Sequence, residues 1–252
     1  MRKADCPTGI IHVHTAASAD GLLDVDDIAQ MCRDRGLSFA AITDHAEDMN
    51  EERMNALVRA CDEHSKDSIL LIPGLEHRYM HGVHVLALGQ RRLIRTESAL
   101  SLFQALLSEK CVLVAAHCAA HEDLPASMLE ILSAVEIWNV SRHTRYLPIS
   151  GCLNAYRRWA AEYPNLYAIG GLDMHRGHEW GCEVVLNRTC GLTEDSVLAA
   201  LRTGEFITKG RLLSFGSRPT GGVRALAFTA GDALAGVRDA RDRVLGASQI
   251  YG

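Results

Sequence analysis

The chain has 252 residues, a formal net charge of −5 at pH 7 and a hydrophobic content of 48%. This length suits one large α/β domain or two small ones, and the apolar share is sufficient for a sizeable buried core. The negative charge and the scattered positions of Lys and Arg argue against a long nucleic acid as the partner.

Apolar runs alternate with amphipathic segments through the first two-thirds of the chain. In chain order, the predicted elements are a strand at 10–14, a helix at 24–35, a strand at 39–43, a helix at 50–64, strands at 69–73 and 83–88, a helix at 97–109, a strand at 111–116, a short helix at 126–133, a strand at 135–139, a helix at 151–162 and a strand at 166–171. This alternation indicates a parallel sheet with helical crossovers. If the sheet closes into a barrel, the carboxyl ends of its strands meet at one face.

The last third of the chain has a less regular pattern. It predicts a strand at 180–186, a helix at 193–202, a short β segment at 206–209 and a final amphipathic helix at 232–245. Asp24 and Thr193 are the expected N-caps of two helices, and Gly36 and Gly204 follow the expected helix ends. The sequence contains no internal repeat, and we expect a single domain over residues 1–252.

The eight cysteines show no CxxC spacing, which indicates free thiols in a reducing compartment rather than a disulfide framework. Residues 1–5 are charged and lead directly into the first predicted strand, so no secretory leader is expected. No apolar run has the length of a membrane span. Together these observations predict a cytoplasmic protein without a membrane partner.

Residues that commonly bind metal ions recur at the ends of the apolar runs. The motifs are His12-Val13-His14-Thr15, Thr43-Asp44-His45, Gly74-Leu75-Glu76, Ala116-His117 and Leu172-Asp173-Met174-His175. Residues two apart in a strand point to the same side, and neutral imidazoles can share a cation where charged ones would repel. One histidine on an apolar run is most often a core residue. Five such motifs at the same structural position instead indicate a cluster of metal ions.

Taken in order over residues 10–176, these motifs resemble those of the PHP (polymerase and histidinol phosphatase) family. The resemblance implies an α/β fold, a distorted (β/α)7 TIM-like barrel of the PHP type, with residues 177–252 completing or flanking the barrel. It also implies a hydrolase of phosphate esters that uses two or three divalent metal ions. Histidine and carboxylate ligands suit Zn, Mn and Fe alike.

The resemblance also implies three sets of metal ligands. They are His12, His14, Glu76 and Asp173 for the first ion; Glu76 as a bridge, His117 and a histidine after the third strand for the second; and Asp20, His45 and His175 for the third. His84 fits the place after the third strand best, with His81 and His77 as competitors. Asp20 lies in a Ser-Ala-Asp-Gly segment where family members commonly carry Ser-Asp-Gly, and its alternative role is that of a turn or helix-cap residue.

Arginines near these motifs are candidates for binding the substrate phosphate. Arg142 and Arg145 follow the predicted strand at 135–139, and Arg176 directly follows the last motif. Guanidinium groups bind phosphate oxygens bidentately, so Arg142 and Arg176 are predicted to join the catalytic residues, the alternative being solvated surface ions. The predicted catalytic residues are His12, His14, Glu76, Asp173, Arg142 and Arg176. His143 and His178 are candidates for protonating a leaving group.

Three functions fit these residues. The first is a phosphomonoesterase for a small substrate such as histidinol phosphate or a nucleotide. The second is a phosphodiesterase or short-oligonucleotide 3′–5′ exonuclease, which would need aromatic side chains for base stacking. Aromatics are few, and Trp138 would either form the floor of a base pocket or pack in the core. The third is a non-catalytic, metal-stabilised binding module, which does not require so many charged groups around an open face.

Overall fold

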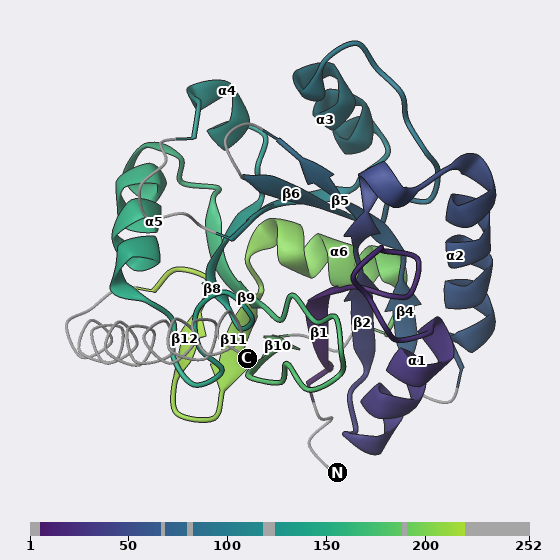
Figure 1. Ribbon diagram of the computed structural model, residues 1–252. Helices are drawn as coiled ribbons and strands as arrows, with labels where there is room; N and C mark the ends of the chain where they lie inside the picture. Colours follow the sequence, from purple (N-terminus) through teal and green to yellow (C-terminus); the bar gives the residue numbers. More distant parts are fainter. Residues whose placement is uncertain (1–5, 67–68, 80–82, 118–123, 188–190, 220–252) are drawn as a thin grey trace, which may run out of the picture.

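The computed structural model describes residues 6–66, 69–79, 83–117, 124–187 and 191–219. Within them the strands form two six-stranded sheets (Figure 1). The first contains, in spatial order, β12 (Ser214–Gly216), β11 (Phe206–Gly210), β10 (Cys182–Leu186), β1 (Thr8–Val13), β2 (Phe39–Ile42) and β4 (Leu70–Ile72). The second contains β3 (Asp44–His45), β5 (Gly74–Arg78), β6 (His84–Leu88), β7 (Val112–Ala116), β8 (Ala134–Asn139) and β9 (Tyr167–Gly171).

The two sheets are joined into one barrel by chain segments that pass from one sheet into the other. Only Thr43 separates β2 from β3, and only Pro73 separates β4 from β5. Proline has no N–H to donate to a sheet ladder, so the ladder is interrupted there. On the other side, the ends of β1 and β9 meet where His14 N–H donates to Met174 O at 2.8 Å. The barrel wall is therefore β1, β2–β3, β4–β5, β6, β7, β8 and β9.

The direction of β6 is the main distortion of this barrel. The alternation of elements predicts parallel strands, but β6 runs antiparallel to both β5 and β7. The sequence pattern also missed β5, which continues β4 beyond Pro73. Only residues 79–83 lie between β5 and β6, too few for a helical crossover, so the chain turns back on itself. As a result, the start of β6 lies at the same edge of the barrel as the ends of β5 and β7.

Helices cover the outside of the barrel (Figure 1). They are α1 (Val25–Asp34), α2 (Glu51–His64), α3 (Ala99–Ser108), α4 (Ala126–Leu129) and α5 (Ser150–Glu162), with a 3-10 turn, η1 (Ala46–Asp48), before α2. Apolar side chains of these helices and the outward-facing side chains of the strands form a large cluster, which we call the outer core cluster and which includes Ile28, Met54 and Phe103. Helix α4 is shorter than the helix predicted at 126–133.

A second core cluster lies inside the barrel, where α6 (Glu194–Thr203) packs against the inward-facing side chains of the strands (Figure 1). Val197 and Leu201 of α6 share this cluster with Ile11 of β1 and Val114 of β7. Helix α6 therefore fills the barrel interior with apolar side chains. The polar residues at the strand ends are left to gather at the edge of the barrel where the carboxyl ends of the parallel strands lie.

Strands that follow residue 176 lie beside the barrel wall. Strands β10, β11 and β12 extend the first sheet beyond β1, each antiparallel to its neighbour, and β12 was missed in the sequence pattern. The predicted helix at 232–245 lies outside the described residues, so a single domain over residues 1–252 stays a prediction. None of the helices in the described part of the chain has the length and apolar character that crossing a membrane requires.

Candidate metal centre

All of the residues expected as metal ligands gather at one edge of the barrel. They are His12 and His14 at the end of β1, Asp20 in the loop that follows, His45 in β3, Glu76 in β5, His84 at the start of β6, His117 after β7, and Asp173 and His175 after β9. His84 reaches this edge because β6 is reversed. The expected convergence of imidazoles and carboxylates is therefore present in the structure.

Three overlapping groups of these side chains have the spacing that a metal ion requires, with one ligand atom from each residue within 4.8 Å of the others. We name them the inner group (His12, Glu76, His117 and Asp173), the outer group (His14, Asp20, His45 and His175) and the bridging group (His45, Glu76 and His84). Glu76 belongs to two groups, as the expected bridge does. A neutral imidazole has one free lone pair, so His45 can bind a cation in only one of its two groups.

The inner group is almost completely buried. His12 Nε2 lies 3.4 Å from Glu76 Oε2 and 3.4 Å from Asp173 Oδ1. His117 Nε2 lies 3.2 Å from Asp173 Oδ2 and 3.4 Å from Glu76 Oε1. Burial by itself would lower the pKa of His12, but Glu136, Asp173 and Glu76 raise that pKa well above its ordinary value. The negative charge that holds a proton on this imidazole would equally attract a cation.

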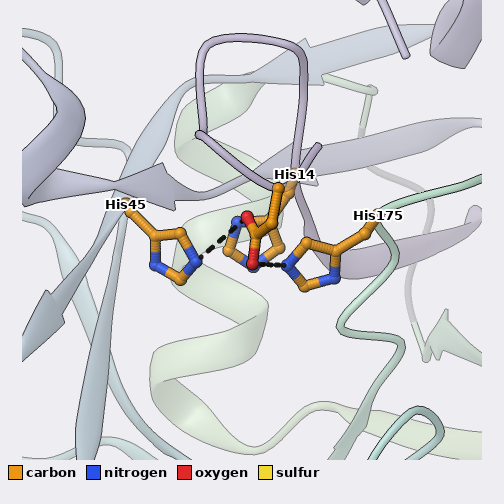
Figure 2. A group of neighbouring side chains, drawn as sticks. His14, His45 and His175 are labelled. Carbon is orange, nitrogen blue, oxygen red and sulfur yellow. Dashed lines mark ion pairs between the residues drawn. The ribbon is translucent and has the colours of Figure 1, made fainter. Parts of the chain in front are cut away.

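The outer group is open to solvent through Asp20, whose side chain is 59% exposed. In Figure 2 the rings of His45 and His175 approach one carboxylate from opposite sides, with His14 behind it. Asp20 Oδ1 is 3.4 Å from His45 Nε2, and Asp20 Oδ2 is 3.2 Å from His175 Nε2. The contacts place Asp20 in the cluster rather than in a cap of α1, where Asp24 takes that position.

The three groups divide His14 and His117 differently from the expected ligand sets, but the distances around Glu76 fit the expected sets as well: Oε2 faces His12 and His14, and Oε1 faces His84 and His117. The resemblance implies His14 for the first ion and His117 for the second, whereas His117 lies in the inner group and His14 in the outer one. His14 Nε2 is nevertheless 3.2 Å from Glu76 Oε2 and 3.5 Å from Asp173 Oδ1. His14 therefore lies between the two groups.

Glu76 is the central carboxylate of the cluster. Its side chain is fully buried, and Oε1 accepts a hydrogen bond from His84 Nδ1 at 2.7 Å. Burial would raise the pKa of Glu76, but His12, His14 and His84 hold that pKa far below its usual range. Of the competitors for the place of His84, His77 points away from the cluster and pairs with Gln90 Oε1 at 2.7 Å. His81 lies outside the described residues.

Buried polar atoms without a hydrogen bond test whether these residues fit metal ions. Within the described part of the chain, the buried side-chain atoms that make no hydrogen bond are His12 Nε2, His14 Nε2, His45 Nδ1, Glu76 Oε2, His117 Nε2, His175 Nε2 and Thr43 Oγ1. Leaving such atoms unsatisfied costs free energy, and native proteins rarely do so. All of these atoms except Thr43 Oγ1 belong to the cluster. They are imidazole nitrogens and a carboxylate oxygen, which are the atoms that bind metal cations.

Three ligand residues of the inner group have a backbone conformation that is uncommon outside glycine. The φ angles of His12, His117 and Asp173 are 62°, 51° and 53°. At His12 the pairing of β1 with β2 shifts register, which marks a β-bulge. The two-residue spacing of His12 and His14 therefore brings their rings to 5.2 Å through a bulge and not through regular strand geometry. Backbone strain of this kind concentrates at functional sites.

Side chains behind the ligands fix the imidazole orientation, and the sequence pattern did not identify them. Glu136 in β8 accepts a hydrogen bond from His12 Nδ1 at 2.7 Å. Ser18 Oγ donates to Asp44 Oδ1 at 2.7 Å, so at His14 Nδ1, 3.3 Å away, it can only accept. Both contacts leave Nε2 free to face the cluster. A glutamate inside an otherwise apolar strand was the available signal for Glu136.

The candidate phosphate-binding arginines differ in how close they lie to the cluster. Arg142 Nε is 3.4 Å from Asp173 Oδ2, although the side chain is 62% exposed. Arg176 is exposed beside the outer group, and its backbone N–H donates to Glu179 Oε2 at 3.1 Å. Arg145 is directed to the loop after β9, where it donates to His178 O at 3.2 Å. Arg142 is therefore the candidate whose side chain contacts an expected ligand residue, Asp173.

Two further expectations concerned side chains near Arg142. His143 is buried, accepts from Asn139 N–H at 3.1 Å and faces Cys152 of α5, so the prediction that it protonates a leaving group is wrong. Trp138 is fully buried in the outer core cluster and donates to Thr144 O at 2.7 Å. Core packing, and not a base pocket, is therefore its role. His178 is exposed and stays a candidate.

A closed barrel with clustered imidazoles and carboxylates at the carboxyl ends of its strands is the arrangement expected of a metal-dependent hydrolase. The sequence model of the PHP domain matches residues 11–153. This match covers more than half of the chain, and the chain belongs to the PHP domain family of metal-dependent phosphoesterases. The expected family and the distorted (β/α)7 barrel are thereby confirmed.

Solved structures resemble the fold at low sequence identity. A two-domain protein of Bacteroides vulgatus, described as containing a predicted PHP-like metal-dependent phosphoesterase, has a TM-score of 0.63 and 16% identity over 86% of this chain and 71% of its own. A protein of Bifidobacterium adolescentis named as a candidate metal-dependent phosphoesterase has a TM-score of 0.48 and 17% identity over 66% of this chain and 87% of its own. No curated protein matches the chain at a significant level.

Proposed function

We propose that this chain is a phosphomonoesterase that hydrolyses a small phosphorylated substrate, such as histidinol phosphate or a nucleotide, with two or three divalent metal ions. The observation that carries the proposal is the set of buried imidazole and carboxylate atoms that face one another without hydrogen bonds. When bound in such a cluster, divalent cations activate a water molecule for attack on phosphorus and neutralise the phosphate oxygens. Zn, Mn and Fe each suit the ligand set.

The residues of the chain would prepare the site for those ions. His12, His14 and His175 each use Nδ1 for a hydrogen bond, to Glu136, Ser18 and the backbone oxygen of Asp173 respectively. Their Nε2 atoms are then the free donors, in the tautomer that metal binding requires. The inner group would hold one ion and the outer group another, with Glu76 bridging to the place beside His84.

Arg142 is the residue that we propose to bind the substrate phosphate. Its guanidinium lies beside Asp173 and remains largely exposed, so it can approach a phosphate that enters through the open outer group. A guanidinium is permanently charged and forms paired hydrogen bonds with phosphate oxygens. Arg176 is proposed for the same function, because it is exposed and directly follows His175 in the chain.

The positions of the three tryptophans favour a monoester over an oligonucleotide. Trp138 and Trp159 are buried in the outer core cluster. Trp180 has the guanidinium of Arg35 over its ring, 3.9 Å from the centroid. Base stacking on a single strand needs exposed aromatic faces beside the reacting atoms, and none of these indoles supplies one at the cluster. The 3′–5′ exonuclease is therefore the second candidate.

Release of phosphate from monoesters, compared with release of p-nitrophenol from a diester, separates the candidates. Metal-free protein would be supplied with Zn, Mn or Fe and assayed on histidinol phosphate, nucleoside monophosphates and bis-p-nitrophenyl phosphate. We expect turnover of at least one monoester that exceeds turnover of the diester. Preference for the diester would support the exonuclease candidate. No turnover with any metal would overturn the enzymatic proposal in favour of the binding module.

A further inference from the structure

Glu136 is a buried carboxylate that serves the metal centre from behind. It lies in the middle of β8, its side chain is fully buried, and it belongs to none of the three ligand groups. Oε1 accepts from His12 Nδ1 at 2.7 Å. Oε2 accepts from the backbone N–H of His117 at 3.1 Å and from Asn139 Nδ2 at 3.0 Å. Two of these three partners are residues of the inner group.

The fold itself does not require a carboxylate at this position. Burying an ionised group costs several kcal/mol unless charged or polar partners compensate, and an apolar side chain of similar size often serves a core better. The neighbours of Glu136 along β8, Val135 and Ile137, are fully buried apolar residues. On β9, Gly171 leaves room for the carboxylate, because a Cβ there would overlap with Glu136 Oε1.

The contacts of Glu136 control two strained ligand residues at once. His12 and His117 both have positive φ angles, and their rings stack at 5.2 Å with 18° between the planes. The bond to Glu136 keeps the proton of His12 on Nδ1 and turns Nε2 toward Glu76 and Asp173. The bond to the backbone N–H of His117 restrains the left-handed conformation from which that imidazole reaches the same place.

A second route leads from Glu136 to the candidate phosphate-binding arginine. Asn139, at the end of β8, donates to Glu136 through Nδ2 and accepts from the backbone N–H of Arg142 through Oδ1 at 2.8 Å. The turn after β8 is thereby attached to the same carboxylate that orients His12. Arg142 Nε in turn lies 3.4 Å from Asp173 Oδ2. The buried side chains of Glu136 and Asn139 therefore connect the inner group with the turn that carries Arg142.

We propose that Glu136 and Asn139 are positioning residues with separate effects. Glu136 holds His12 and His117 in the geometry that binds the inner metal ion. Asn139 holds the turn that presents Arg142 to the phosphate of the substrate. The part that concerns Arg142 rests on the proposed phosphomonoesterase function, whereas the part that concerns the metal ion does not.

Glu136→Gln tests the first effect, because it keeps the shape of the side chain. A carboxylate accepts on both oxygens, but an amide accepts on one, so the variant loses either the bond to His12 or the bonds to His117 and Asn139. We expect zinc affinity at the tightest site to fall by about 10–100-fold, the usual effect of removing such a partner. The measurement is competition with a chromophoric chelator on metal-free protein, which needs no substrate.

The matched control is Glu183→Gln, a carboxylate of β10 that lies outside the cluster and near Lys209. It should bind zinc as the wild type does. Unchanged zinc affinity in a folded Glu136→Gln variant would overturn the first effect. If that variant does not fold, Glu136→Asp keeps the charge on a shorter side chain, and we expect it to fold and bind zinc more weakly than the wild type. Wild-type affinity in Glu136→Asp would also count against the proposal.

Asn139→Ala tests the second effect. It removes the link to Arg142 but leaves the bonds of Glu136 to His12 and His117. We expect zinc affinity within about threefold of the wild type and a KM for the active monoester that rises by at least fivefold, with a smaller change in kcat. An unchanged KM, or a loss of zinc affinity equal to that of Glu136→Gln, would overturn the separation of effects. If no monoester is turned over, the proposed function fails while the zinc result for Glu136 stands.

Discussion

At the scale of single residues, the metal centre depends on imidazoles that have lost their usual partners. In a typical core a buried histidine finds a hydrogen bond for each ring nitrogen. His77 Nε2 pairs with Gln90, whereas His12, His14 and His175 each leave Nε2 without a hydrogen bond. The difference separates a structural histidine from a candidate ligand, although both kinds lie at strand positions that look alike in the sequence.

His14→Ala is the sharpest single-residue test of this distinction. His14 lies between the inner and outer groups, so its loss should weaken both and remove most of the bound metal and of the phosphatase activity. The fold should survive, because the substitution removes an unsatisfied imidazole from a cluster of similar groups. Elemental analysis and circular dichroism measure the two outcomes. His64→Ala, at the end of α2 and away from the cluster, is the control.

A His14→Ala protein that keeps its full metal content and activity would refute the role of His14. A variant that loses metal only because it is unfolded would be recognised by its circular dichroism spectrum. The control should retain both metal and activity.

The same residues show how far the sequence could predict the site. The types of the ligands and their order along the chain are visible because each follows an apolar run. The backbone conformation that turns these side chains toward one another is not visible, because the positive φ angles at His12, His117 and Asp173 depart from regular strand geometry. Nor are the supporting residues, since Glu136 makes contacts with residues far away in sequence.

At the scale of elements, periodicity identified the helices and most of the strands, but not the direction of the strands. Residues 74–78 carry Glu76, His77 and Arg78, which do not look like a strand, yet they form β5. The short connection to β6 then forces an antiparallel pair. The reversal brings His84 to the cluster, so an element that a simple alternation of strands and helices does not predict supplies part of the bridging group.

Substitution of Gly171, at the end of β9, tests how closely β8 and β9 are packed. In Gly171→Ala the new Cβ would overlap with Glu136 Oε1 and approach His12. We expect a loss of about 1–3 kcal/mol in unfolding free energy, as for other overpacked cores, together with weaker zinc binding. Gly216→Ala in β12, where nothing lies within 4 Å of the new Cβ, is the control and should change neither.

Thermal unfolding and chelator competition give both readouts for Gly171→Ala. Wild-type stability in that variant would show that β8 and β9 can move apart without cost. If the variant is less stable but binds zinc with wild-type affinity, the close packing at Gly171 stabilises the fold without controlling the positions of the metal ligands.

At the scale of the whole molecule, the metal centre lies where the two sheets meet. The inner group takes His12 from the first sheet and Glu76 from the second, with His117 and Asp173 at the ends of strands β7 and β9 of the second sheet. An ion bound there would connect segments that are distant in sequence. The sequence predicted that the ligands meet at one edge of a barrel. It did not predict that they lie where two sheets meet, because only the folded chain shows that β2 continues into β3, and β4 into β5, of the other sheet.

Removing the metal should therefore lower the melting temperature of the entire barrel. A ligand that binds only the native state stabilises it by about 4 kcal/mol at a free concentration 1,000 times its Kd. We expect the Tm to fall on treatment with a chelator and to return when zinc or manganese is added. Calorimetry measures the shift. A Tm that does not respond to either step would show that bound ions do not stabilise the fold.

The left-handed backbone at His12, His117 and Asp173 has an evolutionary consequence. A residue with a Cβ costs about 1–2 kcal/mol in that conformation, and glycine and asparagine tolerate it best. A descendant of this chain that no longer needed catalysis would therefore gain stability by accepting Gly or Asn at these positions, and selection for stability would retain such exchanges. In a lineage that has lost the activity, we therefore expect Gly or Asn at the positions of His12, His117 and Asp173 before the surrounding strands change.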